Sequence, residues 1–213
     1  MPTPHWPLWD IRVRTPRVEL RPAHEPEIPA LIDLISGGLH DPSDMPFLQP
    51  FTDMASPERE RGTYQYVLSR WGNWSPDAWE LPFAVVVDDV IVGCQSIEAT
   101  KFPIRRSVTS GSWLGRAYQG QGIGTEMRAA VLEFVFRGLG ALRAETSAYV
   151  ETIASRRVTE KLGYSPDGWS FETVRDERRR NLRFALERQD WAGRDDVVIE
   201  GLGAEALDQF GLS

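Results

Sequence analysis

The sequence has a single cysteine, Cys94, among 213 residues. One thiol cannot form an internal disulfide framework, and this composition suits a reducing cytoplasm. Long apolar runs are also missing, since no stretch approaches the roughly 20 residues that a membrane-spanning helix needs. Prolines and charges interrupt residues 1–16, so we expect no signal peptide there. The sequence therefore predicts a cytoplasmic protein with no membrane partner, in which Cys94 is a small core residue of a strand.

The chain also lacks a net positive charge. It has 24 Lys and Arg residues against 31 Asp and Glu residues, a net charge of −7. Because nucleic-acid phosphates are bound by basic surfaces, nucleic acid is not expected as the main partner. No repeat or low-complexity linker divides the chain. We therefore expect one domain over residues 1–213, with residues 191–213 as a C-terminal extension.

Apolar periodicity predicts strands alternating with helices. Strands are expected at 12–21, 79–87, 90–99, 107–114, 141–150, within 165–188 around a charged turn at 176–180, and at 197–199. Helices are expected at 25–35, from 57, at 127–139, at 153–162 and near 204–210. In the helix at 127–139, charged side chains occupy the side opposite the apolar stripe. This order predicts an α/β fold, with one mixed sheet and helices on its faces.

A glycine-rich turn lies between the strand at 107–114 and the central helix. Glycines occupy positions 120, 122 and 124. The N-terminus of a helix has unpaired amides and a partial positive charge, and glycines let the backbone approach a bulky anion. The pattern is typical of a phosphate cradle that needs no basic side chain. A tight strand-to-helix turn without a ligand explains the glycines equally well.

The residues around these glycines separate three kinds of phosphate-binding loop. A P-loop requires a lysine that is missing here. A dinucleotide fingerprint requires its third glycine one residue later, where Thr125 stands, and an alternating βαβ pattern that the N-terminal half lacks. The third kind, Gln/Arg-x-x-Gly-x-Gly/Ala, fits residues 119–124 at every fixed position. This loop resembles the acyl-CoA loop of the GNAT N-acetyltransferase superfamily.

Two further segments resemble the same superfamily. Residues 154–164 are similar to its late helix, Asn-x-x-Ser-x-x-Val-x-x-x-x-Gly-Phe/Tyr, with Ser155 as the serine. Residues 17–22, RVELRP, are similar to the opening of the branch that contains ribosomal-protein N-terminal acetyltransferases. The chain departs from the pattern at Thr152, where the family has asparagine, and at Thr159, where many relatives have a tyrosine that acts as general acid.

The resemblance implies a single-domain, mostly antiparallel mixed sheet flanked by helices on both faces. It implies an N-acyltransferase that moves an acyl group from acyl-CoA to a primary amine by direct attack, without a metal. Ser155 is the implied acid for the leaving thiolate. The resemblance matches no glutamate as base, so a carboxylate or a water chain takes the proton of the amine. By strand position, Glu145 and Glu172 are the candidate carboxylates. A backbone amide near Trp113 or Leu114 is expected to stabilise the oxyanion. The residues implied in cofactor binding are Trp113, Leu114, Gln119, Gly120, Gln121, Gly122, Ile123, Gly124, Thr125 and Ser155.

Several alternatives stay open from sequence. The donor is acetyl-CoA, which needs a small apolar pocket, or succinyl-CoA, which needs a basic residue at no evident position. The acceptor is a small amine, a protein N-terminus or a lysine. A CoA-binding sensor that has lost turnover and a purely structural domain are competing functions. The loop at 40–55 is a binding loop or a cover for the core. The strand at 197–199 is a possible edge strand in a homodimer.

Overall fold

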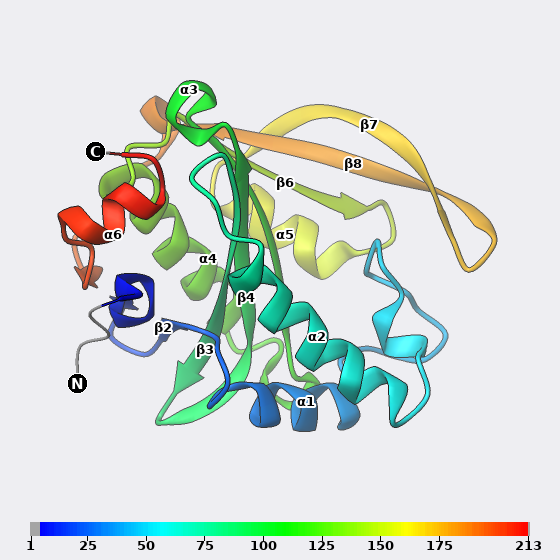
Figure 1. Ribbon diagram of the computed structural model, residues 1–213. Helices are drawn as coiled ribbons and strands as arrows, with labels where there is room; N and C mark the ends of the chain where they lie inside the picture. Colours follow the sequence, from blue (N-terminus) through cyan, green and yellow to red (C-terminus); the bar gives the residue numbers. More distant parts are fainter. Residues whose placement is uncertain (1–4, 213) are drawn as a thin grey trace.

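The computed structural model describes residues 5–212, and within them nine strands form one sheet (Figure 1). The strand order is β7-β8-β6-β5-β4-β3-β2-β1-β9. Among these strands only β5 and β6 are parallel neighbours. The strands are β1 Arg12–Arg14, β2 Glu19–Pro22, β3 Ala78–Val87, β4 Val90–Thr100, β5 Ser107–Leu114, β6 Arg143–Tyr149, β7 Ser165–Val174, β8 Glu177–Glu187 and β9 Val198–Glu200. The mixed, mostly antiparallel sheet is confirmed.

Helices cover both faces of this sheet. They are α1 Ile28–Ser36, α2 Glu58–Gly72, α3 Phe102–Arg105, α4 Ile123–Glu133, α5 Ile153–Lys161 and α6 Ala204–Gln209, and a π-helical turn, η4 Phe134–Gly138, extends α4. Helix α1 contacts β4 and α2 contacts β3, whereas α4 contacts β1, β2, β4 and α5 (Figure 1). Among residues 5–212, no helix combines the length and the apolar character that a membrane crossing requires.

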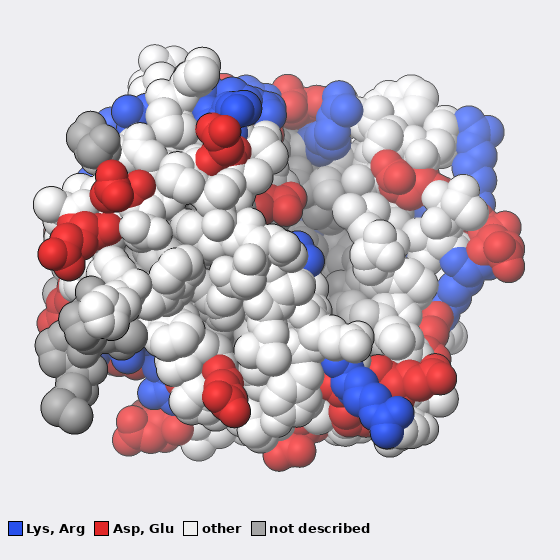
Figure 2. Space-filling model, in the orientation of Figure 1, with Lys and Arg blue, Asp and Glu red and all other residues white. Residues whose placement is uncertain are grey.

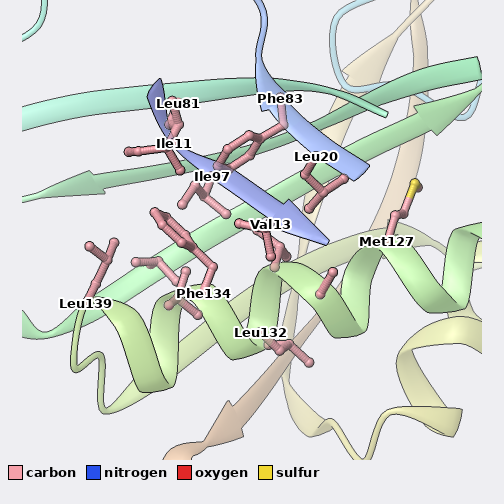
Figure 3. Close-up of a cluster of buried hydrophobic side chains, with 14 of the residues drawn as sticks. Ile11, Val13, Leu20, Leu81, Phe83, Ile97, Met127, Leu132, Phe134 and Leu139 are labelled. Atoms are coloured by element: carbon pink, nitrogen blue, oxygen red, sulfur yellow. The ribbon is translucent and has the colours of Figure 1, made fainter. Parts of the chain in front are cut away.

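The main core lies between the sheet and α4 (Figure 3). Side chains alternate across a strand, so Leu81 and Phe83 of β3 point to the same face, where Ile97 of β4 joins them. The Phe83 and Phe134 rings meet edge to face with centroids 5.6 Å apart. On the opposite face Cys94 packs with Ala23, Ala84 and Leu31 of α1, and burial raises the pKa of its thiol to about 12. Cys94 is therefore a core residue, as predicted.

Several expected boundaries differ from the structure by a few residues, as in α4, which begins at Ile123 and not at 127, and two differences change the local structure. The first expected strand is a hairpin of β1 and β2, closed by the Thr15 amide donating to the Val18 carbonyl over 2.8 Å. Pro16 lies in this turn, where its missing N–H is tolerated. The charged turn expected at 176–180 is shorter, because only Arg175 and Asp176 have left-handed backbones and β8 already begins at Glu177.

Helix α4 is buried on its polar side as well as on its apolar side. Glu126, Arg128 and Glu133 are only 7 %, 4 % and 5 % exposed. The Glu126 carboxylate accepts hydrogen bonds from Thr15 Oγ1 over 2.6 Å and from Arg17 Nε over 2.8 Å. Amphipathic spacing located the helix correctly, but it could not show that a second layer of chain covers the charged side.

The C-terminal segment supplies part of that second layer. Glu133 Oε1 accepts hydrogen bonds from Trp191 Nε1 and from the Arg194 amide, both over 2.7 Å. The segment then adds β9 to the sheet beside β1, with Ile199 opposite Val13. The expected strand is thus present and pairs within its own chain, whereas the homodimer remains a prediction.

Replacing Glu133 with leucine is expected to destabilise the fold by about 3 kcal/mol. The substitution leaves two buried donors without an acceptor and removes the partner of Arg137. The free energy of unfolding in urea measures the effect. The matched control is Asp77→Asn, which breaks the exposed pair with Lys101, whose groups are 2.8 Å apart, and should change little. Equal effects of the two substitutions would contradict an anchoring role for Glu133.

Candidate active site

The sheet opens between its two parallel strands. Strands β5 and β6 pair only from Ser107 opposite Arg143 to Thr109 opposite Glu145. Beyond that point β5 continues beside β4, and β6 continues beside β8. The Thr146 hydroxyl donates to the Ser110 carbonyl over 3.1 Å and closes the base of the opening. Beyond this point no strand within residues 5–212 pairs with this edge of β5, although Gln119 Nε2 donates to the Leu114 carbonyl.

The free edge presents the amides of two residues. The Gly115 amide donates to the Val92 carbonyl of β4 over 2.9 Å. Since backbone groups alternate between the two edges of a strand, the Trp113 amide also faces β4. The amides of Ser112 and Leu114 therefore face the opening. Of the two residues expected to offer an oxyanion amide, this geometry favours Leu114 and not Trp113.

The glycine loop ends against the N-terminus of α4. Gly120 and Gly122 have φ values of 73° and 82°, left-handed values that favour glycine. A Cβ atom on Gly120 would meet nothing within 4 Å, so the space before the helix is open. The Thr125 amide already donates to the Gly122 carbonyl over 3.1 Å. The amides available to a ligand are thus those before Thr125.

A cleft of about 720 Å³ joins this loop to the sheet opening. Gln121 and Ile123 do not line it, because Gln121 Nε2 donates to the Ala117 carbonyl and Ile123 is a core residue. Gln119 fixes the loop, since its Nε2 donates to the Leu39 carbonyl over 2.7 Å and to the Leu114 carbonyl over 2.9 Å. The predicted residues that line the cleft are Trp113, Leu114, Gln119, Gly120, Gly122, Gly124, Thr125 and Ser155.

The cleft continues through the sheet. A second cavity of about 280 Å³ shares Ser112, Arg128 and Ser155 with the cleft and extends to Glu80 and Glu98. A third cavity, of about 360 Å³, begins at the same two glutamates and lies against α2. Figure 2 shows the resulting groove as a hollow between the surface over α2 and the surface over the β7–β8 hairpin. One groove therefore connects the N-terminus of α4 with the α2 face of the sheet.

Two carboxylates lie opposite each other on the α2 side of this groove. Glu80 of β3 is paired with Glu98 of β4 in the strand register. Arg70 Nη1 lies 2.9 Å from Glu80, and the Tyr66 hydroxyl donates to the same carboxylate. Glu98 is open to the groove, and among the described residues it has no hydrogen bond or ion pair with a side chain. Burial and the neighbouring Glu80 raise the pKa of Glu98.

A sequence model of the GNAT acetyltransferase domain matches residues 17–165. The chain belongs to the GNAT acetyltransferase family. It is an acyl-CoA-dependent N-acetyltransferase, which excludes the purely structural and the non-catalytic interpretations. The match spans the glycine loop, the sheet opening and the late helix, so it covers most of the residues that line the groove.

Solved structures of other acetyltransferases have the same fold. RimJ of Mycobacterium smegmatis, in complex with CoA-disulfide, has 22% sequence identity and a TM-score of 0.71, over 86% of this chain and 90% of that one. RimL, a ribosomal L7/L12 alpha-N-protein acetyltransferase in complex with coenzyme A, has 20% identity and a TM-score of 0.67, over 81% and 95%. An acetyltransferase from Salmonella typhimurium that modifies the N-terminal serine of L7/L12 has 20% identity and a TM-score of 0.66, over 81% and 96%.

The acetyltransferase places the three expected catalytic residues at different points of the structure. Ser155 lies in the first turns of α5 and lines both the cleft and the second cavity. Glu145 lies at the closed end of the opening, with Oε1 2.8 Å from Arg143 Nε, and reaches only the third cavity. Glu172 accepts a hydrogen bond from Ser170 over 2.7 Å and lines none of the three cavities. The structure thus brings Ser155 to the sheet opening, and Glu145 and Glu172 lie away from it.

Sequence reasoning missed Glu98 and Arg128. A signal for Glu98 was present, because a hairpin turn at Asp88-Asp89 brings Glu80 and Glu98 opposite each other in otherwise apolar strands. The sequence has no comparable signal for Arg128, because it is one of several charged residues on the predicted polar side of a helix. No group of three or more potential metal ligands lies together within residues 5–212.

The loop at 40–55 covers part of the core and also lines the groove, whereas its role as a binding loop remains a prediction. Met45 is buried with Tyr149 and Val174, so it covers a small core. Phe47 and its neighbours line the cleft and the second cavity. Arg175 of the β7–β8 turn holds the loop, with Nη2 2.6 Å from Asp53 Oδ1 and Nη1 donating to the Pro42 carbonyl.

Replacing Arg175 with alanine is expected to raise the KM for the acceptor several-fold with a smaller change in kcat. The loop then loses its anchor to the hairpin and closes the groove less often, while the groups at the sheet opening stay in place. Steady-state kinetics at saturating acyl-CoA measure this. Arg178→Ala is the matched control on the same hairpin, where Arg178 packs on the Phe171 ring. An unchanged KM in the Arg175 variant would contradict an acceptor role for the loop.

Proposed function

We propose that this acetyltransferase transfers the acetyl group of acetyl-CoA to the free α-amine of a protein or peptide N-terminus. We call the part of the groove beside Glu80 and Glu98 its acceptor half, and the part beside the glycine loop its donor half. The observation that carries the proposal is the free carboxylate of Glu98, which lies opposite Glu80 in the strand register and faces the acceptor half. The RimL and Salmonella proteins support the choice of acceptor, because both are described as acting on an N-terminus of L7/L12. An α-amine also ionises near pH 8, about two units below a lysine, and so is easier to deprotonate.

The donor half of the groove suits coenzyme A. Backbone amides of Gly120, Gly122 and Gly124 at the positive end of α4 are placed to bind its diphosphate. The free edge of β5 offers the backbone of Ser112 to the amide groups of the pantetheine arm. Arg116 lies at the rim of the cleft and adds a positive charge for a further phosphate. The bound thioester supplies an activated acyl group.

Three groups of the chain then divide the chemistry. Glu98 takes a proton from the ammonium group of the acceptor, which makes the nitrogen nucleophilic. The Leu114 amide donates a hydrogen bond to the acyl oxygen as negative charge develops there. Ser155 donates a hydrogen bond to the departing sulfur and hands on a proton to it.

The surroundings of Thr159 favour Ser155 for this last role. Thr159 stands where many relatives have the acidic tyrosine. Its hydroxyl donates to the Ser155 carbonyl over 3.0 Å and accepts from Arg128 Nη1 over 2.8 Å. The Thr159 proton is therefore already used, whereas the Ser155 side chain faces the space shared by the two halves of the groove.

The acceptor is tested by thiol release from acetyl-CoA with three amines of matched concentration. They are a peptide with a free N-terminus and no lysine, the same sequence with a blocked N-terminus and one lysine, and a small primary amine. We expect at least tenfold higher kcat/KM for the first. Turnover confined to the lysine peptide or to the small amine would contradict the proposed acceptor.

A further inference from the structure

Arg128 is a buried cation at the junction of the two halves of the groove. It projects from the second turn of α4, is 4 % exposed, and lines both the cleft and the second cavity. Nη1 donates to the Thr159 hydroxyl over 2.8 Å, and Nη2 donates to the Ser112 hydroxyl over 3.2 Å. Nε is buried and has no partner within residues 5–212. The described residues also place no carboxylate within 4 Å of this guanidinium.

A buried charge that contacts only hydroxyl groups is unfavourable for the fold. Removing a guanidinium from water without an opposite charge costs several kcal/mol. Burial accordingly lowers the pKa of Arg128. Two neutral hydroxyl groups do not need a full positive charge between them, so the present contacts do not account for an arginine. An anionic ligand would supply both the missing charge and an acceptor for Nε.

The position of Arg128 indicates which ligand group that is. Its partner Ser112 lies on the free edge of β5, next to the amide proposed to bind the acyl oxygen. Arg128 lies four residues beyond Gly124, about 6 Å further along the helix from the proposed diphosphate site. The second cavity also carries many hydroxyl groups beside its apolar lining of Phe47, Leu48 and Ala148, although an acetyl group needs only a small apolar pocket. The lining hydroxyl residues are Ser96, Thr109, Ser110, Ser112, Thr146, Ser147, Tyr149, Thr152 and Ser155.

We infer that Arg128 binds the terminal carboxylate of a short dicarboxylic acyl group carried by CoA, such as succinyl. The enzyme then has a second activity beside acetylation, and this inference rests on the proposed donor site. In the transfer, the amine nitrogen forms a bond to the acyl carbon and the carbon–sulfur bond breaks. The ammonium group loses one proton to Glu98 before the attack. The nitrogen loses a second proton as the amide forms, and this proton passes through Ser155 to the departing thiolate. The terminal carboxylate is not consumed, and the product is an amide that carries a free carboxylate.

The first test compares acyl donors on the wild-type enzyme, with acetyl-CoA as a reference. Succinyl-CoA and butyryl-CoA have acyl chains of equal carbon number and differ in terminal charge. We expect kcat/KM to be at least tenfold higher for succinyl-CoA than for butyryl-CoA. Equal values, or a preference for butyryl-CoA, would overturn the inference without any variant having to fold.

The second test assigns the preference to Arg128. In Arg128→Gln the ratio of succinyl-CoA to butyryl-CoA kcat/KM should fall at least tenfold, and Arg128→Lys should recover part of it. The matched control is Arg157→Gln, an exposed cation on α5, which should keep the wild-type ratio. If Arg128→Gln slows all donors equally, Arg128 serves the leaving sulfur and the inference is wrong.

Binding separates this inference from the proposed function. Isothermal calorimetry gives Kd for both thioesters on wild-type enzyme without an acceptor. Tighter binding of succinyl-CoA together with no turnover on any amine would refute the proposed acceptor chemistry and leave the carboxylate site standing. Turnover of acetyl-CoA together with equal Kd values for succinyl-CoA and butyryl-CoA would refute the carboxylate site and leave the proposed acceptor chemistry standing.

Discussion

Replacing Glu98 with glutamine should lower kcat/KM for acetyl transfer by about 10²- to 10⁴-fold, the range for loss of a general base. Glutamine keeps the size of the side chain but cannot accept the proton of the acceptor. Binding of CoA should be unchanged, because Glu98 lies in the acceptor half of the groove. Thiol release at saturating acetyl-CoA measures the effect. The matched control is Glu145→Gln, which alters the carboxylate that sequence reasoning favoured and should change the rate less than threefold.

The pH dependence gives an independent check on Glu98. A base acts only when it is deprotonated, so the rate rises with pH through the pKa of Glu98. Burial and Glu80 raise that pKa, which moves the acid limb of kcat/KM to higher pH than an ordinary glutamate gives. Glu80→Gln removes the neighbouring negative charge and should therefore move the acid limb to lower pH. An acid limb that stays in place, or moves to higher pH, would show that Glu98 is not the base.

Replacing Gly124 with aspartate should weaken CoA binding at least a hundredfold. Gly124 has no left-handed backbone, and a Cβ atom there would meet only Leu114 Cδ1, at 3.7 Å, so a side chain fits. A carboxylate in the first turn of α4 stabilises the helix through its dipole but repels the diphosphate. In this variant the affinity for CoA, measured by calorimetry, should therefore fall, whereas the thermal unfolding temperature should rise.

The neutral variants Gly124→Asn and Gly124→Ala separate charge from bulk. Asparagine has nearly the shape of aspartate, so it should weaken CoA binding by much less. Similar Kd values for the aspartate and asparagine variants would mean that no phosphate lies near Gly124. Loss of thermal stability in all three variants would point to a structural reason for this glycine.

The glycine loop could be predicted from sequence because its chemistry is local. Its glycines, the helix start and the spacing lie within a few residues of one another, and the structure places the left-handed glycines and the open space there. The limits of the loop were less predictable. Gln121 and Ile123 fit the pattern as well as their neighbours do, yet one bonds to Ala117 and the other joins the core.

Glu98 and Arg128 depend on distant parts of the chain. Glu98 has a raised pKa partly because Glu80 lies opposite it in the β3–β4 register, and it reaches the groove because β5 and β6 separate. Arg128 is buried because α5 packs on the charged side of α4, just as Trp191 and Arg194 cover Glu133. Helical periodicity shows which residues share a face, but it does not show what covers that face.

The most direct test of the assigned groove is a crystal structure of the enzyme with acetyl-CoA and a non-reactive acceptor peptide soaked into the crystal. It should show the diphosphate bound to the amides of Gly120, Gly122 and Gly124, with the pantetheine along the free edge of β5. The acyl carbon should lie at the sheet opening, within reach of an acceptor nitrogen bound by Glu98. Density for the ligand elsewhere, or an acceptor nitrogen far from Glu98, would contradict this assignment of the groove.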